Sequence, residues 1–260
     1  MDAPAPSSRA NMSAPPVTAL GMASIALVAG GIIWLASHLP AGTPVKVLEL
    51  ETINRFWASD PSLTIEALAE RLRGRLGASR APRVLVGWGV GGAVADALAA
   101  PARRVVVLDA PAPGALNAEP TEAQRLRSFA MYVGARKGRT VVPAQLTLEN
   151  VRDAAIAAGA LRADTSLPAV ERCFEEHTAR VLRDHRLIAD YAPSGTPLTV
   201  VKAAHSLVPE SPALGWDRFG PVESLGSGGD HYSMLTDGAA AAHLAMLLRR
   251  WLTPAFATAA

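Results

Sequence analysis

Residues 84–99, VLVGWGVGGAVADALA, constrain the fold of this chain more than any other stretch. An apolar segment leads into a turn made almost wholly of glycine, and a run of small residues follows the turn without a spacer. A buried strand, a tight turn and a helix packed on the strand produce this pattern. Two different functions can begin with such a unit.

The first interpretation is a dinucleotide site. Gly87, Gly89 and Gly92 fit G-x-G-x-x-G between a strand and a helix. Asp109 ends the next apolar run, VVVLD, about 20 residues on, where a ribose-binding acid belongs. This alternative predicts a Rossmann-type oxidoreductase that binds NAD or FAD. It gives no role to His231, and it leaves two earlier strand-helix units unexplained.

Composition limits the choice of partners. The chain has 260 residues, half of them hydrophobic, so it can bury one full core with or without an added lid. The net charge of +2 and the few aromatic residues give no support to a nucleic-acid partner. A single cysteine, Cys173, excludes an internal disulfide and a cysteine metal cluster, which suits a cytoplasmic protein.

The N-terminal part divides into two. Residues 1–16 are rich in alanine, proline and serine and predict a flexible leader or a linker. Residues 17–39 carry no Asp, Glu, Lys or Arg and are long enough to cross a bilayer. Interrupting glycines, the lack of flanking positive charge and a strand-like VKVLEL segment favour core strand, turn and helix over a membrane span.

Strands and helices alternate along most of the chain, which predicts an α/β fold with a mostly parallel sheet flanked by helices. The expected strands are residues 19–28, 45–50, 84–88, 105–109, 197–203 and 220–224, and the expected helices outside the middle region are 32–39, 63–76, 90–99 and 241–252.

Residues 114–193 have a different pattern. Three helices are expected around residues 125–133, 148–161 and 169–191, with no strong strand between them. An all-helical segment between two sheet strands is typical of a lid, so the predicted division is a core of residues 17–113 and 194–260 with a helical lid at 114–193. The basic residues Arg136, Lys137 and Arg139 are interpreted as a solvated loop.

Four phrases in order carry a second, more specific interpretation. Residues 87–92, GWGVGG, match a GWSxGG nucleophile elbow at every fixed place but the serine. Asp109 lies in VVVLDAPAPG, His231 lies in GDHYSML, and residues 213–216 are ALGW. Together the phrases resemble the thioesterase domains that end nonribosomal peptide and polyketide synthases, an α/β-hydrolase family with a helical lid.

The resemblance implies an α/β-hydrolase fold and a set of roles. Asp109 would orient His231, which would act as the base, and Gly89 occupies the nucleophile position. The oxyanion hole would come from the N–H groups of Val90 and of a residue near Ala29. The substrate would be an acyl or peptidyl thioester on the phosphopantetheine arm of a carrier protein, with no metal or diffusible cofactor.

Gly89 is the main departure from the family pattern, because glycine has no side chain to attack a thioester. Glycine adopts the strained elbow conformation freely, so the fold tolerates the loss of serine. Asp109 and His231 could then deprotonate water, a hydroxyl, an amine or an acidic carbon directly, giving hydrolysis, cyclisation or condensation. Two alternatives stay open: a serine thioesterase disabled by a serine-to-glycine change, and a noncatalytic member that binds acyl carrier or product.

Other candidates receive structural interpretations. Cys173 is expected to pack within a lid helix, and Ser233 to cap a helix start and not to attack substrate. Trp88 and Trp216 are expected in the core. Leu27 and Val28 stand where the family has a histidine and a proline.

Overall fold

The structure is a computed structural model that describes residues 17–21, 35, 38–39, 43, 45–49, 62–76, 84–99, 104–116, 119–208 and 210–252. The predicted leader at 1–16, the oxyanion candidate Ala29, and most of the helix expected at 32–39 lie outside these residues. Within the described ranges, no helix is long and apolar enough to cross a membrane.

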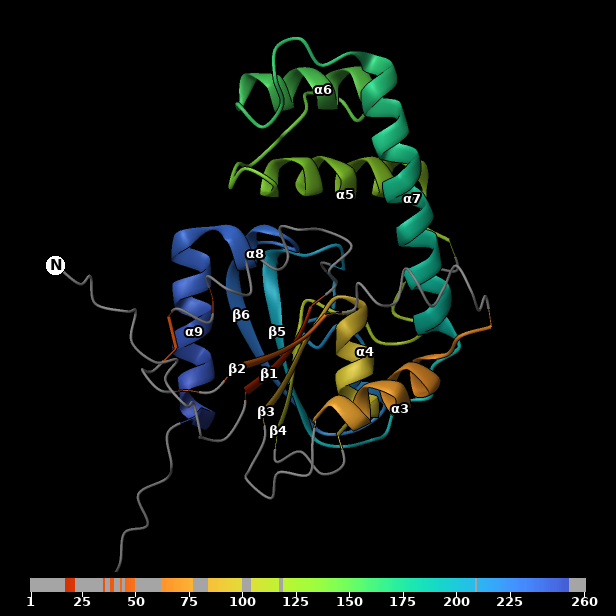
Figure 1. Ribbon diagram of the computed structural model, residues 1–260, viewed down its shortest axis with the longest axis vertical. Coiled ribbons are helices and arrows are strands. Elements are labelled where there is room, and N and C mark those ends of the chain that lie inside the picture. Colours follow the sequence, from red (N-terminus) through yellow and green to blue (C-terminus); the bar gives the residue numbers. More distant parts are fainter. Residues whose placement is uncertain are drawn as a thin grey trace, which may run out of the picture.

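A parallel sheet of six strands forms the centre of the molecule (Figure 1). The order across the sheet is β2-β1-β3-β4-β5-β6, and every neighbouring pair is parallel. The strands are β1 (Val17–Gly21), β2 (Val45–Glu49), β3 (Val84–Trp88), β4 (Arg104–Leu108), β5 (Leu198–His205) and β6 (Val222–Asp230). The predicted α/β architecture with a mostly parallel sheet is confirmed.

The last strand is longer than the sequence predicted. Residues 220–224 were expected to be the strand and Gly229 to lie in a following loop, but β6 continues to Asp230. Its partner β5 is also long, and the pairing reaches His205 and Asp230 after an irregularity between Ala203 and His205. The backbone pairing overrides the low strand propensity of three glycines in β6. His231 therefore follows the strand directly.

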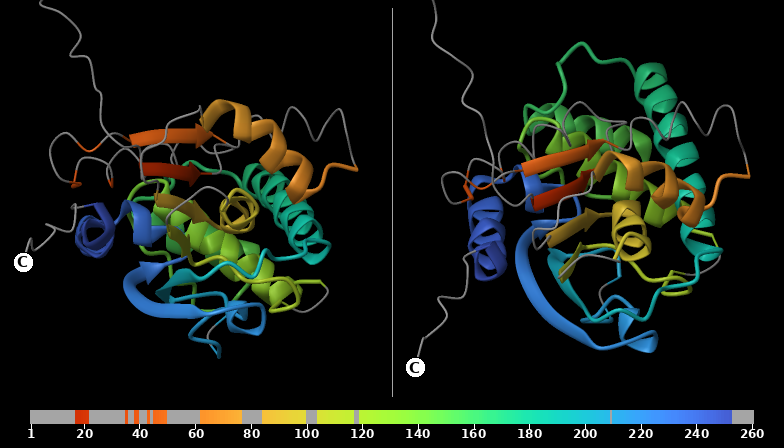
Figure 2. Two further views of the ribbon diagram at one scale, coloured as in Figure 1. Left: turned by 90° about the horizontal axis from the view of Figure 1, so that it is seen from below. Right: turned by 60° about the horizontal axis from the view of Figure 1, so that its bottom comes forward.

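Helices cover both faces of the sheet, as the views in Figure 2 show for α4 and α9. These helices are α3 (Ile65–Leu76), α4 (Val90–Ala97), the short α8 (Ser233–Thr236) and α9 (Gly238–Leu252). Alternate strand residues point to opposite faces. In β4, Val105 and Val107 join the core beneath α3 and α4, while Val106 and Leu108 join the core beneath α9.

Three helices are inserted between β4 and β5 and stand beyond one end of the sheet (Figure 1). They are α5 (Glu122–Ala135), α6 (Leu148–Ala157) and α7 (Leu167–Ala189), and they bury a separate core around Phe129, Val151 and Val170. We call them the three-helix insertion. Thr121 begins α5 with a reciprocal capping box to Gln124.

A buried carboxylate ties the end of this insertion to the sheet domain. Asp96 on α4 accepts hydrogen bonds from Tyr191 Oη at 2.7 Å, from Ser194 Oγ at 2.7 Å and from Ser194 N at 2.9 Å. These bonds fix the segment that follows α7 against α4, so the C-terminal end of α7 has a defined position over the sheet.

Candidate functional site

The three predicted catalytic residues meet at the carboxyl end of the sheet. Gly89 follows β3, Asp109 follows β4 and His231 follows β6. The strands are parallel, so these ends lie on one edge. The chain runs from β1 outward to β2 and then returns to β3 on the other side of β1. Ligands of open α/β sheets bind outside the strand ends at such a reversal.

Gly89 has the backbone conformation of an elbow, with φ 57° and ψ −133°. Its N–H donates to the carbonyl of Leu108 at 3.3 Å, and its carbonyl accepts from Gly92 at 2.9 Å. A Cβ placed on Gly89 would lie 3.5 Å from Nε2 and 3.6 Å from Cε1 of His231. A side chain at position 89 would therefore point at the histidine ring without a clash.

The other two glycines of the G-x-G-x-x-G pattern serve packing. A Cβ on Gly87 would overlap the carbonyl of Gly91, and one on Gly92 would lie 2.5 Å from the Cβ of Ala110. Both distances are closer than real Cβ contacts, so glycine lets α4 lie directly against the strands. Close packing of α4 on the strands therefore accounts for Gly87 and Gly92 of the G-x-G-x-x-G pattern without a bound dinucleotide.

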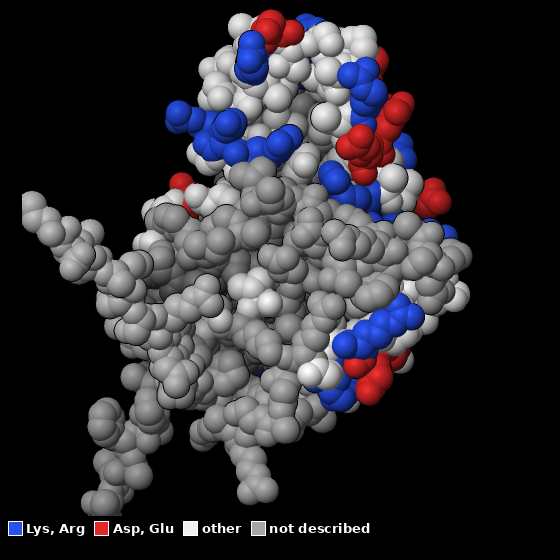
Figure 3. Space-filling view, in the orientation of Figure 1, with Lys and Arg blue, Asp and Glu red and all other residues white. Residues whose placement is uncertain are grey.

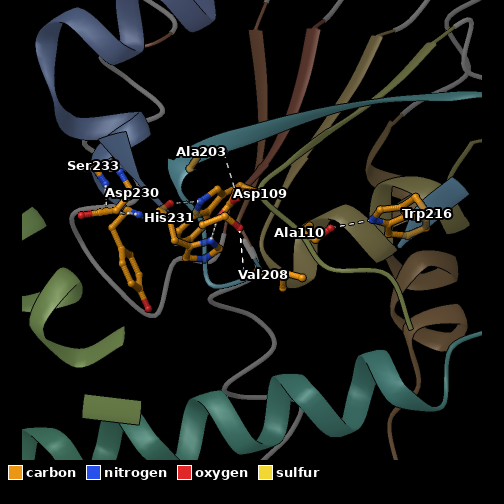
Figure 4. Close-up of polar contacts among 11 residues, drawn as sticks. Asp109, Ala110, Ala203, Val208, Trp216, Asp230, His231 and Ser233 are labelled. Carbon is orange, nitrogen blue, oxygen red and sulfur yellow. Dashed lines mark hydrogen bonds and ion pairs between the residues drawn. The ribbon is translucent and has the colours of Figure 1, made fainter. Parts of the chain in front are cut away.

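Asp109 and His231 form a buried pair (Figure 4). His231 Nδ1 lies 2.9 Å from Asp109 Oδ2, with side-chain exposures of 13% and 1%. The backbone N–H of Ala203 donates to the other carboxylate oxygen at 3.1 Å. A carboxylate only accepts, so the Nδ1 proton is directed to Asp109 and Nε2 faces the Gly89 side. The acid that a dinucleotide would need is thus bonded to His231.

Asp109 is also unusual in its backbone. Its φ is +42°, a region that few residues other than glycine adopt, and its N–H donates to Val201 at 2.9 Å. Such strain costs on the order of 1–3 kcal/mol and persists where surrounding bonds fix it. Here the bonds from β5 hold the carboxylate where the histidine can reach it.

Two aromatic side chains hold the His231 ring. Trp88 stacks on it with centroids 4.6 Å apart and donates from Nε1 to the His231 carbonyl at 2.7 Å. Tyr232 contacts the ring edge-on at 4.9 Å. Trp88 and Trp216 are core residues as predicted, with exposures of 3% and 1%. Trp216 Nε1 donates to Ala110, so it braces the turn that carries Asp109 (Figure 4). The sequence did not reveal these positioning contacts.

The turn beyond β6 is closed by reciprocal hydrogen bonds. Asp230 Oδ1 accepts from the N–H groups of Tyr232 and Ser233, and Ser233 Oγ accepts from the Asp230 N–H at 2.7 Å. The Ser233 hydroxyl is therefore part of the turn that presents His231; it does not cap the helix as predicted, because α8 begins at Ser233 itself and has no side-chain cap. Cys173 is exposed on α7, so the expectation that it is packed is wrong.

A pocket opens at this edge, and one face of α7 forms its far wall. Residues 177, 180, 181, 184, 185 and 188 line it at helical spacing, opposite Gly89, Val90 and His231. The sequence alone did not reveal this wall. The three- and four-residue spacing shows that these side chains share one face of α7. It does not show that this face lines a pocket, because that depends on the elements packed opposite.

Burial controls the charge of two groups in this wall. His177 is 2% exposed and lies 3.1 Å from Ser128 Oγ through Nε2. Burial, followed by the positive charges of Arg180 and His231, lowers its pKa to about 3. Burial raises the pKa of Asp184 to about 6, although the Arg183 guanidinium opposes that shift. His177 is accordingly neutral at pH 7.

The described residues contain no cluster of three or more His, Cys, Asp or Glu side chains that could hold a metal ion. Arg136, Lys137 and Arg139 are exposed after α5. On the face shown in Figure 3, the described residues of the three-helix insertion carry both basic and acidic side chains.

No protein-family model and no curated protein sequence matches the chain. Solved structures match at low identity. The holo form of AB3403, a four-domain nonribosomal peptide synthetase bound to AMP and glycine, is 19% identical with a TM-score of 0.62. The match covers 95% of this chain but only 20% of that protein, which is much longer.

Two single thioesterase structures match over nearly their full length. RedJ, a thioesterase from the prodiginine pathway of Streptomyces coelicolor, is 17% identical, with 93% of this chain and 95% of that one covered and a TM-score of 0.55. The Vlm2 thioesterase domain is 20% identical, with coverages of 91% and 93% and a TM-score of 0.52. The chain therefore has an α/β-hydrolase fold like that of thioesterase domains.

Proposed function

We propose that this chain releases an acyl or peptidyl group from a carrier-protein thioester, and that His231 acts as a general base on the acceptor without an acyl-enzyme. One observation supports this most. The position that a nucleophile side chain would occupy at residue 89 adjoins His231 Nε2, and Gly89 leaves it to the acceptor. Water or a substrate hydroxyl at that place is within hydrogen-bonding reach of the base.

Hydrolysis of the thioester would proceed in two steps. Water oxygen attacks the thioester carbonyl carbon as its proton passes to Nε2 of His231. The carbon–sulfur bond then breaks, the sulfur takes the Nε2 proton, and a free acid and a thiol result. Asp109 keeps the ring in the correct tautomer and stabilises its protonated form, as the acid of a triad does. An internal hydroxyl, amine or acidic carbon in place of water gives cyclisation or condensation.

Val90 is the proposed oxyanion donor. It is the first residue of α4, where a backbone N–H has no partner within the helix, and it lines the pocket. The helix N-terminus favours negative charge at that point. A second N–H near Ala29 is part of the proposal. One such donor contributes about 10²- to 10³-fold in rate.

The three-helix insertion is proposed to act as a lid, within the predicted segment 114–193. Residues of α5 and α7 line the same pocket as Gly89 and His231. A cover over the pocket excludes bulk water and leaves a path for the phosphopantetheine arm. The proposed partner is the acyl or peptidyl carrier protein that bears this arm, and the steps above require no metal or diffusible cofactor.

The test is product formation from a panel of acyl-pantetheine and carrier-bound thioesters. We expect the chain to turn over at least one of them, and His231→Ala to reduce the rate about 10²- to 10⁴-fold. His205→Ala, which changes an exposed histidine outside the pocket, serves as the control. Mass spectrometry during turnover should show unmodified protein. Equal rates for the chain and His231→Ala would refute the base assignment.

A second candidate rests on the same position. A Cβ at residue 89 meets no atom closer than 3.5 Å, so a serine fits by space. If only Gly89→Ser turns over, the chain is a serine thioesterase without its serine. If neither is active and the acyl carrier or product still binds, the chain is a noncatalytic binding member.

A further inference from the structure

Although the surface of the pocket as a whole is mainly apolar, the wall that α7 presents contains polar residues. Of its six lining residues only Val181 and Ile188 are aliphatic. The remaining four are His177, Arg180, Asp184 and His185. His177 and Asp184 already have bonds to Ser128 and Arg183. A hydrocarbon acyl chain over the half-buried Arg180 would dehydrate its guanidinium without giving it a hydrogen bond, which is costly. The wall therefore indicates a ligand with a polar group.

Arg180 is close enough to Asp184 for its charge to act on the pKa of that carboxyl, but the two side chains form no salt bridge. Arg180 is half-buried, and its guanidinium carbon lies 5.4 Å from the centre of the Tyr132 ring. In the part of the chain that the structure describes, no carboxylate forms a salt bridge with it. The adjacent carboxylate, Asp184, is instead bonded by Arg183 through Nε at 3.1 Å and Nη2 at 3.0 Å.

The neighbouring titratable groups do not cancel this charge. Arg183 bonds Asp184 directly, whereas Arg180 acts on the same carboxyl only through its charge. His177 is neutral at pH 7 because its pKa is about 3, and burial lowers the pKa of His185 as well. Burial raises the pKa of Tyr232, so its hydroxyl stays protonated. Arg180, Arg183 and Asp184 together carry a net charge of +1 at pH 7, and Arg180 is the member that forms no salt bridge with a described carboxylate.

We propose that Arg180 binds an anionic oxygen group, a carboxylate or a phosphate, on the thioester substrate. A guanidinium presents planar paired donors that match either group, and a partly dehydrated site strengthens the bond. Stacking on Tyr132 restricts the guanidinium before the ligand arrives. The inference rests on the proposed function and specifies its substrate: the anion is either a carboxylate on the acyl chain or the phosphate of the pantetheine arm.

The experiment uses the full chain and matched pairs of substrates. Short acyl thioesters that end in a carboxylate are compared with thioesters of equal length that end in a carboxamide. In parallel, pantetheine thioesters are compared with phosphopantetheine thioesters of one neutral acyl group. We expect one of the two anionic members to be preferred about 10- to 100-fold in kcat/KM, because that is the usual effect of one charged hydrogen bond.

Variants of Arg180 then test whether this residue causes the preference for the anionic substrate. Arg180→Gln should abolish it, and Arg180→Lys should retain part, since a lysine keeps the charge and loses the paired geometry. Arg172→Gln is the matched control, because Arg172 is exposed on the same helix and does not line the pocket. A preference that survives in Arg180→Gln would overturn the proposal, as would equal rates for both members of both pairs.

Binding measurements separate this proposal from the proposed function. Calorimetry with glutarate, its monoamide and inorganic phosphate needs no turnover. If no thioester reacts but glutarate or phosphate binds the chain and not Arg180→Gln, the release activity fails and the anion site stands. If thioesters react, but neither the substrate preference nor the binding of glutarate or phosphate changes in Arg180→Gln, the release activity stands and the anion site fails.

Discussion

The Cβ position of Gly89 lies 3.5 Å from Nε2 of His231, while Nδ1 of the same ring lies 2.9 Å from Oδ2 of Asp109. The histidine is therefore held between a carboxylate and a position that has no side chain. A base that is oriented on one side and open on the other is what direct attack by an external or internal acceptor requires.

Replacing Gly89 tests how that open position is used. Gly89→Ser should give a covalent acyl-enzyme, seen as an added acyl mass on the protein, because the hydroxyl would lie beside Nε2. Gly89→Ala introduces the same backbone strain without a hydroxyl and fills the acceptor position. It should abolish turnover by the parent mechanism. Both variants should lose on the order of 1–3 kcal/mol of unfolding free energy at φ 57°. An acyl adduct on Gly89→Ala would exclude residue 89 as the attachment site.

Asp109→Asn tests the orientation of the base. An amide in place of the carboxylate favours the wrong tautomer of His231 and no longer stabilises the charged ring. We expect turnover to fall about 10²- to 10⁴-fold with little change in KM. Asp217→Asn, at an exposed position of the short 3-10 helix Trp216–Arg218, is the control. If Asp109→Asn and the parent have equal kcat, Asp109 serves the fold alone.

His177 predicts a loss of stability in acid. Its pKa falls from 6.5 to about 3 on burial, so below pH 6.5 the unfolded chain binds a proton that the folded chain does not. The folded state therefore loses stability as the pH falls from 6.5 toward 3. The contribution of this one group is about 3 kcal/mol between pH 7 and pH 4.

Urea unfolding at both pH values measures this effect. His177→Gln, which can still bond Ser128, should show a smaller loss between pH 7 and pH 4 than the parent. His205→Gln, at an exposed position, should follow the parent curve. Parallel curves for the parent and His177→Gln would show that His177 is not the group responsible.

Replacing glycine by alanine should have opposite effects on stability at Gly92 in α4 and at Gly74 in α3. Gly92→Ala places a Cβ 2.5 Å from Ala110 and 2.9 Å from Val107 Cγ1, so overpacking should cost about 1–3 kcal/mol. At Gly74, inside α3, a Cβ meets nothing within 4 Å. Gly74→Ala should therefore stabilise by about 0.5–1 kcal/mol through helix propensity. Thermal unfolding of the two variants gives the comparison, and a stable Gly92→Ala would contradict the close packing of α4.

Local patterns were enough to predict much of the fold. Apolar runs such as residues 84–88 and 105–109 are buried on both faces of a parallel sheet, and this burial makes them recognisable in one dimension. The three helices of the insertion have clear apolar spacing, and α5 and α6 begin with threonine caps. The last strand was underestimated because the pairing of β6 with β5, and not local propensity, extends it through Gly229 to Asp230.

The sequence by itself determined the chemistry that is available: a glycine where an elbow side chain would attack, an aspartate at one strand end, and a histidine in the phrase after the last strand. Only the tertiary structure decided how these residues are used. Residues 109 and 231 are far apart in the chain, and the parallel sheet brings their side chains into contact because both follow carboxyl ends on the same edge. The same folding turned one face of α7 toward the pocket, where burial keeps His177 neutral and Asp184 forms its salt bridge with Arg183 and not with Arg180. Such effects depend on neighbours from distant segments, which the order of residues does not specify locally.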